Sequence, residues 1–260
     1  MEITWKSADS YEFYMGRWSR LVARAFIKWL SPPAGLKWLD IGCGSGALSE
    51  EIVNNCHPTE LIAIDQSENF VNEVQRRLGK LALCKVGNAL SLPVKDNAVH
   101  FAVSGLVLNY ISDPVKALVE MRRAVAPKGT AAIYVWDYSG KMDFLNKFWD
   151  AAVALDPTAS TLHQGRRFQN TTAEALRGFF VDARYANIET APMDIETFFQ
   201  KFDDYWKPFL GGQGPAPTYL MSLDESARQK LRDRIFASLP FQADGTIRMY
   251  SRAWAVKGQA

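Results

Sequence analysis

The residues best suited to binding chemistry in this sequence are three glycines and the aspartate just before them. Asp40 and the glycines of 42–46 stand at alternate positions along the chain. The apolar residues of 36–41 predict a buried strand, and 47–53 predicts a helix. A strand, a glycine turn and a helix together hold a nucleotide-like ligand against a helix N-terminus. Glycine suits the turn because a Cβ would block the approach of the ligand to the backbone.

The glycine pattern has two interpretations. Gly42-x-Gly44-x-x-Ala47 fits the dinucleotide-binding fingerprint, whereas Asp40-x-Gly42-x-Gly44-x-Gly46 fits the first motif of class I methyltransferases that use S-adenosylmethionine (SAM). Asp40 favours the second, because a carboxylate two residues before the turn would repel a pyrophosphate but suits a ligand with an ammonium and a sulfonium. A glycine turn that binds no ligand is the third interpretation.

A second carboxylate, Asp65, ends the predicted strand 60–65. An acid at the tip of the strand that follows a glycine turn is placed to accept both hydroxyls of a ribose. The alternative is that Asp65 only caps the helix that follows it.

Strands and helices alternate along the first half of the chain, which predicts a doubly wound parallel sheet of the α/β class. The five predicted strands are 36–41, 60–65, 81–86, 99–103 and 130–136. Ligands of such sheets bind beyond the carboxyl ends of the strands. The polar or aromatic residues expected at those ends are Asp40, Asp65, Asn88, Ser104 and Trp136.

Residues 36–137 resemble the SAM-dependent methyltransferases of the ubiquinone/menaquinone-biosynthesis type, or methyltransferase type 11. The motifs that carry the resemblance are the glycine segment 40–46, the acid Asp65, Gly87–Pro93, Leu108–Pro114 and Pro127–Gly129. The resemblance implies a Rossmann-like seven-stranded sheet, mostly parallel, with an antiparallel seventh strand. It also implies a methyltransferase that uses SAM and leaves S-adenosylhomocysteine.

Roles at the methionine and ribose parts of SAM follow from the resemblance. Asp40 and the backbone of the glycine turn would contact the methionine part, and Asp65 would hold the ribose. Ser104 would lie near the methionine end. Tyr14 or Arg17, from a predicted N-terminal helix, would reach the methionine carboxylate. The complete set of predicted cofactor residues is Tyr14, Arg17, Asp40, Gly42, Cys43, Gly44, Gly46, Asp65, Gln66, Ser67, Phe70, Asn88, Ala89 and Ser104.

The adenine would be surrounded by Gln66, Ser67 and Phe70 and edged by Asn88 and Ala89. The family usually has Asp where this chain has Asn88. An amide oxygen can still accept a hydrogen bond, but it lacks the charge-assisted increment. We therefore expect weaker binding of the cofactor, not its loss.

The rest of the chain is expected to complete one methyltransferase domain over 1–260. Its predicted parts are an N-terminal helical segment 1–35, a SAM-binding core 36–138, a helical lid at 139–182 and 196–245, and the last two strands at 187–195 and 247–257. Pro192 requires an edge position for its strand, and the family places the sixth strand at the edge. Aromatic residues would line the substrate side: Trp136, Tyr138, Trp149 and Trp206.

Composition limits the partners. A net charge of +2 is too small for a nucleic-acid binder, and no apolar run predicts a membrane span. The three cysteines lack metal-ligand spacing, so no metal is expected.

We expect a cytoplasmic monomer or homodimer acting on a small, apolar or aromatic molecule. The alternatives are a SAM-binding regulator without turnover and an NAD-dependent oxidoreductase.

No catalytic residue is assigned, because methyl transfer from SAM is a direct displacement that needs a base only for a weakly acidic nucleophile. Candidate bases are Asp137, Tyr138 and His163.

Overall fold

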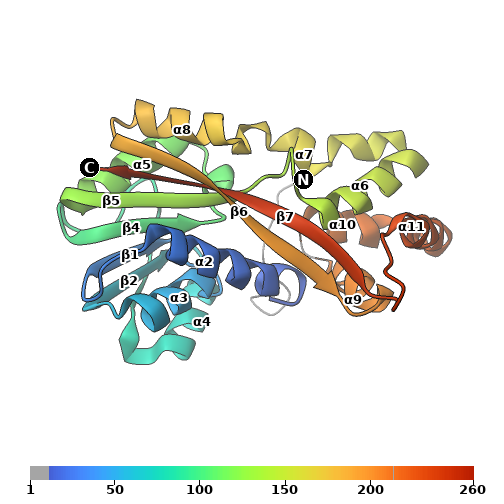
Figure 1. The fold of residues 1–260 in the computed structure, drawn as a ribbon, viewed down its shortest axis with the longest axis horizontal. Coiled ribbons are helices and arrows are strands. Elements are labelled where there is room, and N and C mark those ends of the chain that lie inside the picture. The colour runs from blue at the N-terminus through green and yellow to red at the C-terminus, as the bar shows by residue number, and fades with distance from the viewer. Residues whose placement is uncertain (1–11, 213) are drawn as a thin grey trace. The chain divides into compact units, whose positions relative to one another are not determined.

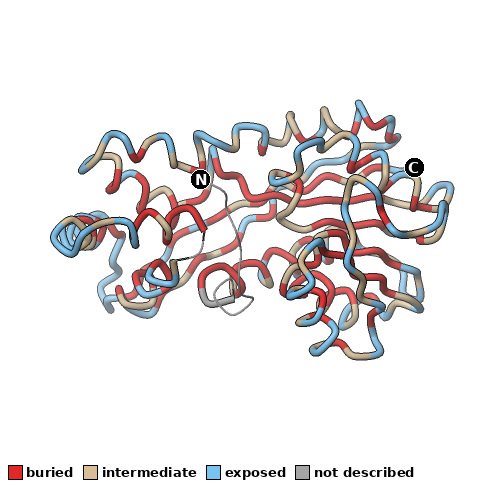
Figure 2. The backbone as a smooth tube through the Cα atoms, turned by 180° about the vertical axis from the view of Figure 1, so that it is seen from behind, coloured by how far each residue is buried: buried red, intermediate tan, exposed pale blue. Residues whose placement is uncertain are grey.

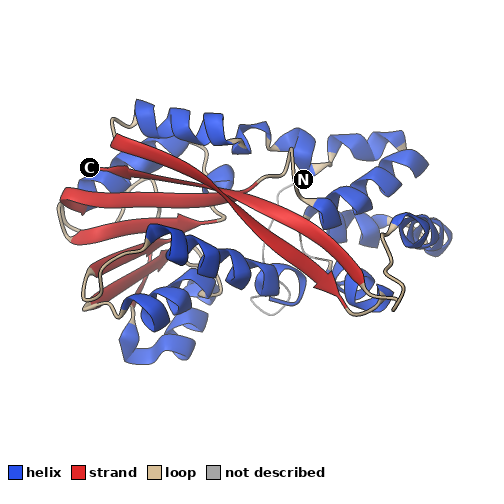
Figure 3. Cartoon of the chain, in the orientation of Figure 1, coloured by secondary structure: helices blue, strands red, loops and turns tan. Residues whose placement is uncertain are grey.

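Seven strands form one mixed sheet in the order β3-β2-β1-β4-β5-β7-β6. The computed structural model describes residues 12–212 and 214–260, with side chains from Tyr14 onward; residues 1–11 of the predicted N-terminal segment lie outside this description. The strands, red in Figure 3, are β1 Lys37–Ile41, β2 Glu60–Asp65, β3 Leu83–Val86, β4 Val99–Gly105, β5 Val125–Trp136, β6 Ala186–Phe199 and β7 Ile247–Gln259.

Ten α-helices are described (Figure 1). They are α2 Arg17–Leu30, α3 Ala47–Cys56, α4 Glu68–Leu78, α5 Pro114–Ala124, α6 Asp143–Leu155, α7 Gln164–Arg167, α8 Ala173–Asp182, α9 Phe202–Trp206, α10 Pro215–Ser222 and α11 Glu225–Ser238. Shorter helical turns stand at Glu12–Gly16, Gly79–Leu81, Leu108–Tyr110, Pro157–Thr161, Gln169–Thr171 and Lys207–Gly211. None of the helices in this part of the chain combines the length and apolarity needed to cross a bilayer.

The pairing confirms the predicted fold. β1 pairs in parallel with β2 and β4, β2 with β3, and β4 with β5, whereas β7 runs antiparallel to β5. β7 lies between β5 and β6, so β6 takes the edge position that Pro192 requires.

Several predicted boundaries are corrected. β3 begins at Leu83, not at residue 81, because Gly79–Leu81 forms a tight helical turn. β6 extends to Phe199 because the alternation of buried and exposed side chains continues that far, so the insertion predicted from residue 196 begins only after the strand. The cap of α8 is Thr172, whose hydroxyl accepts the N–H of Ala175.

The chain divides into two compact units. Unit 1 holds the described residues up to Trp18, Asp137–Gln169 and Asp194–Arg252. Unit 2 holds Ser19–Trp136, Asn170–Met193 and Ala253–Ala260. Unit 2 therefore contains the predicted SAM-binding core, and unit 1 contains most of the predicted lid.

Unit 2 buries both faces of its strands, which are largely red in Figure 2. α5 and α8 cover one face, where Ile133 packs with Leu118 and Phe180. α2, α3 and α4 cover the other (Figure 1), where the ring of Tyr134 lies 4.6 Å from that of Phe26. Neighbouring residues of β5 thus point to opposite faces, as the pleat of a strand requires.

Unit 1 is organised around aromatic rings. The rings of Phe148 and Phe209 stack with centroids 4.7 Å apart, and the hydroxyl of buried Tyr205 donates to the carbonyl of Phe144 over 2.7 Å. This cluster joins α6, α9 and the turn Lys207–Gly211.

Candidate functional site

The glycine turn lies between the end of β1 and the start of α3. Gly42, Gly44 and Gly46 have φ angles of +71°, +51° and +92°, which residues with a Cβ rarely adopt. The N–H groups of Gly42 and Cys43 both donate to the carbonyl of Ile64, over 2.7 and 3.0 Å. The turn is therefore fixed to the neighbouring strand β2.

Gly42 also allows the loops after β1 and β4 to touch. A Cβ on Gly42 would lie 2.6 Å from Cγ2 of Val107, well inside van der Waals contact. The loop after β4 therefore packs directly on the glycine turn.

Asp65 is buried at the end of β2 and fixes the turn from a second side. Its Oδ2 accepts the N–H of Gly44 over 3.0 Å, and its Oδ1 accepts that of Ser67 over 2.9 Å. Burial raises the pKa of this carboxyl, against the effect of these hydrogen bonds. Each carboxylate oxygen can accept more than one hydrogen bond, so the carboxylate keeps acceptor capacity for the hydroxyls of a ribose.

Asp40 is buried, and only one of its oxygens has a partner. Oδ2 accepts the hydroxyl of Ser49 over 2.6 Å, whereas Oδ1 has no hydrogen-bond partner among the described residues. Burial, with the nearby charge of Asp65 adding to it, raises the pKa of Asp40 to about 7. A buried unpaired oxygen of this kind fits a cationic N–H donor, such as the ammonium of SAM.

Ser104 joins β4 to β1. Its buried hydroxyl donates to the carbonyl of Ile41 over 2.8 Å, at the strand ends where Asp40 is in register with Val103. The hydroxyl proton of Ser104 therefore links β4 to β1, and only the lone pairs of its oxygen remain to accept a hydrogen bond from a ligand.

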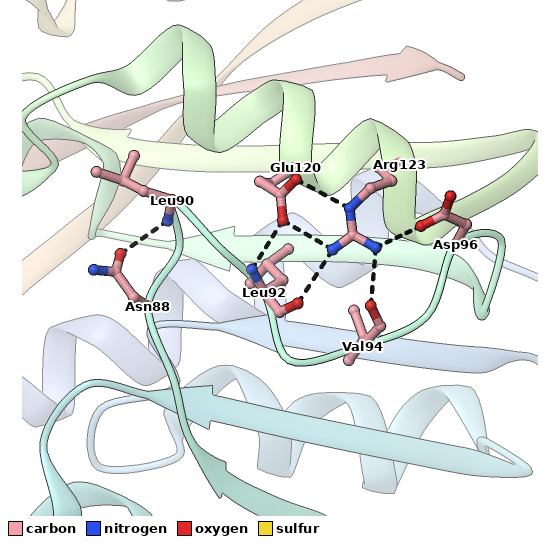
Figure 4. A network of polar contacts seen from close by, with 7 residues as sticks. All are labelled: Asn88, Leu90, Leu92, Val94, Asp96, Glu120 and Arg123. Atoms are coloured by element: carbon pink, nitrogen blue, oxygen red, sulfur yellow. Dashed lines mark hydrogen bonds and ion pairs between the residues drawn. The ribbon is translucent and has the colours of Figure 1, made fainter.

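The residues predicted around the adenine lie after β2 and β3. Gln66 is exposed, and Ser67, Phe70 and Ala89 are half-buried. Asn88 is exposed, and its Oδ1 accepts the N–H of Leu90 over 2.9 Å (Figure 4). The amide oxygen of Asn88 thus already has one bond within its own loop and one lone pair to spare.

A polar clamp from α5 fixes this loop (Figure 4). The guanidinium of Arg123 donates to the carbonyls of Leu92 and Val94, over 3.1 and 2.9 Å, and pairs with Asp96 at 2.7 Å and Glu120 at 2.8 Å. Glu120 in turn accepts the N–H of Leu92 over 2.9 Å. These hydrogen bonds raise the pKa of Arg123 and lower that of Glu120.

The sequence alone does not predict this clamp or the contact of Ser49 with Asp40. The spacing of Glu120 and Arg123 indicates a helical i, i+3 pair, but nothing in it indicates that the pair would bind the backbone of a loop about 30 residues earlier. Ser49 could be predicted only from the turn geometry that places it beside Asp40.

Unit 2 brings together Asp40, the glycine turn, Asp65, Ser67 and Ser104. Tyr14 and Arg17 belong to unit 1. The guanidinium of Arg17 lies 4.2 Å from the ring centre of Trp18 and 4.7 Å from that of Phe199, and it donates to the carbonyl of Asp204 over 3.2 Å. Burial lowers its pKa. A cofactor role for Tyr14 and Arg17 stays a prediction.

The four aromatic residues predicted to contact substrate are all buried. Trp136 lies in unit 2, and Tyr138, Trp149 and Trp206 lie in unit 1. The indole of Trp149 donates to the side chain of Gln164 over 3.2 Å, and Trp206 stacks on Phe202. They pack as core residues, so their role toward a substrate also stays a prediction.

A hollow of about 350 Å³ lies within unit 1, between α6, α10 and α11. Its lining residues include Leu155, Tyr219, Lys230 and Leu231. None of the four predicted substrate residues is among them.

The family model described as "Methyltransferase domain" matches residues 39–133, which run from β1 into β5.

Two curated relatives illustrate the range of similar proteins. Demethylmenaquinone methyltransferase of Staphylococcus aureus is 26% identical over 167 residues, which are 59% of this chain and 69% of that protein. A tRNA (carboxymethyluridine(34)-5-O)-methyltransferase of Mus musculus is 31% identical over 125 residues, 46% of this chain and 17% of that protein. The chain spans only 27%, 55% and 38% of three further curated relatives.

A solved structure shares the fold. Phosphoethanolamine N-methyltransferase 2 of Haemonchus contortus, in complex with SAM, superposes with a TM-score of 0.60. The superposition covers 96% of this chain and 56% of that chain at 17% identity. At this identity the likeness concerns the fold alone.

The clamp around Arg123 generates the first prediction. Arg123→Ala removes the bonds to the carbonyls of Leu92 and Val94, and we expect the free energy of unfolding to fall by roughly 1–2 kcal/mol, since the pair is partly screened by solvent. Amide hydrogen exchange should accelerate across residues 88–97. Arg122→Ala, on the exposed side of the same helix, should change stability by less than about 0.5 kcal/mol. Equal effects of the two substitutions would contradict the clamp.

Asp40 generates a prediction about pH. Its pKa is about 7 in the folded protein, against 3.8 when unperturbed. Between these values the native state holds a proton that the unfolded chain has released, so stability falls as pH rises, by up to ~1.4 kcal/mol per pH unit. Urea denaturation from pH 5 to 8 should show this loss, and Asp40→Asn should reduce it. The exposed-site variant Asp182→Asn should keep the wild-type slope; an Asp40→Asn profile as steep as the wild type would disprove the assignment.

Proposed function

We propose that the protein transfers a methyl group from SAM to a small, apolar or aromatic molecule, on the premise that residues 39–133 match the family model described as "Methyltransferase domain". The observation that carries the proposal is the buried, unpaired oxygen of Asp40 beside the glycine turn. A ligand with a positive ammonium and a sulfonium satisfies that oxygen, whereas the pyrophosphate of a dinucleotide would be repelled by it and by Asp65.

The residues of unit 2 fit the cofactor at several points. The free acceptor sites of Asp65 suit the two ribose hydroxyls, and the half-buried Phe70 and Ala89 suit the faces and edge of an adenine. The spare lone pair of Asn88 suits the adenine amine. Asp40 suits the ammonium of the methionine part.

SAM supplies, when bound, a methyl group on a positively charged sulfur. Because transfer is a direct displacement, the main demand on the protein is alignment of donor and acceptor, which can contribute roughly 7–11 kcal/mol. The rigid backbone of the glycine turn and the clamped loop 88–97 would provide that alignment on the side of the cofactor.

The candidate bases are partly engaged within the fold. Oδ2 of Asp137 accepts the N–H of Lys141, and Nδ1 of His163 accepts that of Gly165. Burial lowers the pKa of His163, so its imidazole is neutral near pH 7. We assign proton transfer to none of them.

Three features favour a small acceptor. The net charge of +2 provides no strong electrostatic attraction for a phosphate backbone. Unit 1, which contains most of the predicted lid, is rich in aromatic side chains. The Staphylococcus aureus relative is named for demethylmenaquinone, whereas the mouse relative is named for tRNA.

The two alternatives are a SAM-binding regulator without turnover and an NAD-dependent oxidoreductase. Thermal shift with SAM, S-adenosylhomocysteine and NAD separates the oxidoreductase from the other two. Only an assay of turnover separates the methyltransferase from the regulator.

Asp65 provides the direct test of the cofactor site. Asp65→Ala removes the acceptors for a ribose, and we expect the affinity for S-adenosylhomocysteine, measured by calorimetry, to fall at least tenfold, which corresponds to ~1.4 kcal/mol or more. Because the carboxylate also accepts two backbone N–H groups, the melting temperature should fall as well. Tyr185→Phe is the control: it removes a buried hydrogen bond to the carbonyl of Leu118 and should leave the affinity unchanged. Wild-type affinity in Asp65→Ala would rule out the ribose contact.

The class of acceptor is tested with methyl-labelled SAM. The protein is incubated with separate pools of small metabolites, RNA and protein from a bacterial extract. We expect label in the small-molecule pool. Label confined to the RNA or protein pool would overturn the proposed substrate class, while absence of label from all pools, despite binding of SAM, would favour the regulator.

A further inference from the structure

Asn109 is a polar residue of unit 2 whose side chain the fold does not use. It lies in the helical turn Leu108–Tyr110 that follows β4. Both polar atoms of its amide are buried, and neither has a hydrogen-bond partner among the described residues. Leu108 before it is packed in the core, and Tyr110 after it is exposed.

An amide left this way is costly. It offers two donors and an oxygen that accepts two bonds, and each buried group without a partner lowers the stability of the fold. Because most buried polar groups in native proteins have partners, an unpaired one calls for an explanation such as an absent ligand or water.

The backbone around Asn109 is fixed. The N–H of Tyr110 donates to the carbonyl of Val107 over 2.8 Å, and that of Leu106 donates to the carbonyl of Tyr134 over 2.7 Å. The main chain therefore has partners of its own, and the side chain of Asn109 caps none of it.

The turn lies where a ligand of this sheet is expected. β1 and β4 are neighbours, and the chain runs outward from them in opposite directions, to β2 and β3 on one side and to β5 on the other. Such a switch point is where doubly wound sheets bind ligands. The loop after β4 touches the loop after β1 through Val107 and Gly42. Each of the two strand ends also carries buried polar atoms without a partner among the described residues: Oδ1 of Asp40 at the end of β1 and the amide of Asn109 after β4.

We propose that the amide of Asn109 binds the amino-acid end of SAM, an inference that rests on the proposed function. With the ribose on Asp65 at the end of β2, the opposite end of the molecule extends over β1 toward β4. The NH₂ group of Asn109 donates to the carboxylate of SAM, and its oxygen accepts from the ammonium that Asp40 also faces. One neutral side chain thus binds both the ammonium and the carboxylate of the amino acid. Asp40 and Asp65 could bind only the ammonium, because their negative charges would repel the carboxylate.

The test uses Asn109→Leu, which keeps the volume of the side chain and removes all its polar groups. The melting temperature of the free protein should rise, because a buried unpaired amide is replaced by an apolar group. The affinity for S-adenosylhomocysteine should fall about tenfold. The affinity for 5′-methylthioadenosine, which lacks the amino acid, should change by less than twofold. Asn54→Leu, at an exposed position of α3, is the matched control and should leave both affinities unchanged.

Each other outcome overturns the assignment. Unchanged affinity for S-adenosylhomocysteine, with a lower melting temperature, would mean that the amide holds a structural water. An equal loss for both ligands would place the amide on the nucleoside. If the leucine variant does not fold, Asn109→Asp keeps the shape, and its negative charge should weaken only S-adenosylhomocysteine. A wild-type protein that binds neither ligand would refute the proposed function itself, a result distinct from normal wild-type binding that Asn109→Leu leaves intact.

Discussion

The candidate site depends on the carboxylate of Asp65. This one side chain accepts backbone N–H groups from the turn after β1 and from the start of α4, and so it holds two separate loops at one strand end. The group is buried, where a hydrogen bond is stronger than in water and an unpaired charge is far more costly. The position of the glycine turn therefore follows from the need to satisfy this carboxylate.

Asp40 is the second buried acid at these strand ends, and its hydrogen bonds are less complete than those of Asp65. Burial, with the charge of nearby Asp65 adding to it, raises the pKa of Asp40, and one of its carboxylate oxygens has no partner among the described residues. Two buried acids at adjacent strand ends disfavour each other's ionisation, and a positive ligand relieves this repulsion, as protonation does. The repulsion between the two carboxylates at the strand ends therefore favours the binding of cationic ligands and disfavours phosphates.

The sequence predicted the parallel part of the sheet because strands and helices alternate along the first half of the chain, and Pro192 predicted an edge position for its strand. The antiparallel seventh strand was implied by the family resemblance. The sequence also predicted the strand-end residues Asp40, Asp65 and Ser104, since the chain order of parallel strands places their ends together. It did not predict the clamp of Arg123 on residues 92–96, or the partners that Ser49 and Asp65 find. Those contacts join residues that local periodicity cannot relate. The aromatic residues Trp149 and Trp206 show the same limit, because an amphipathic pattern cannot distinguish a wall of a pocket from a packed core.

The place of β7 in the sheet has a consequence for how the protein is made on the ribosome. β5 emerges before β6 and β7, but its neighbour in the finished sheet, β7, is the last of the seven described strands to be synthesised. During translation of the intervening hundred or so residues, the edge of β5 stays unpaired, and such an edge invites pairing with other nascent chains. β6 is synthesised before β7 yet ends outside it, so it cannot occupy the vacant edge without blocking the final insertion. A delay in the synthesis of β7, or its loss, would therefore produce aggregation before it produced any defect in cofactor binding.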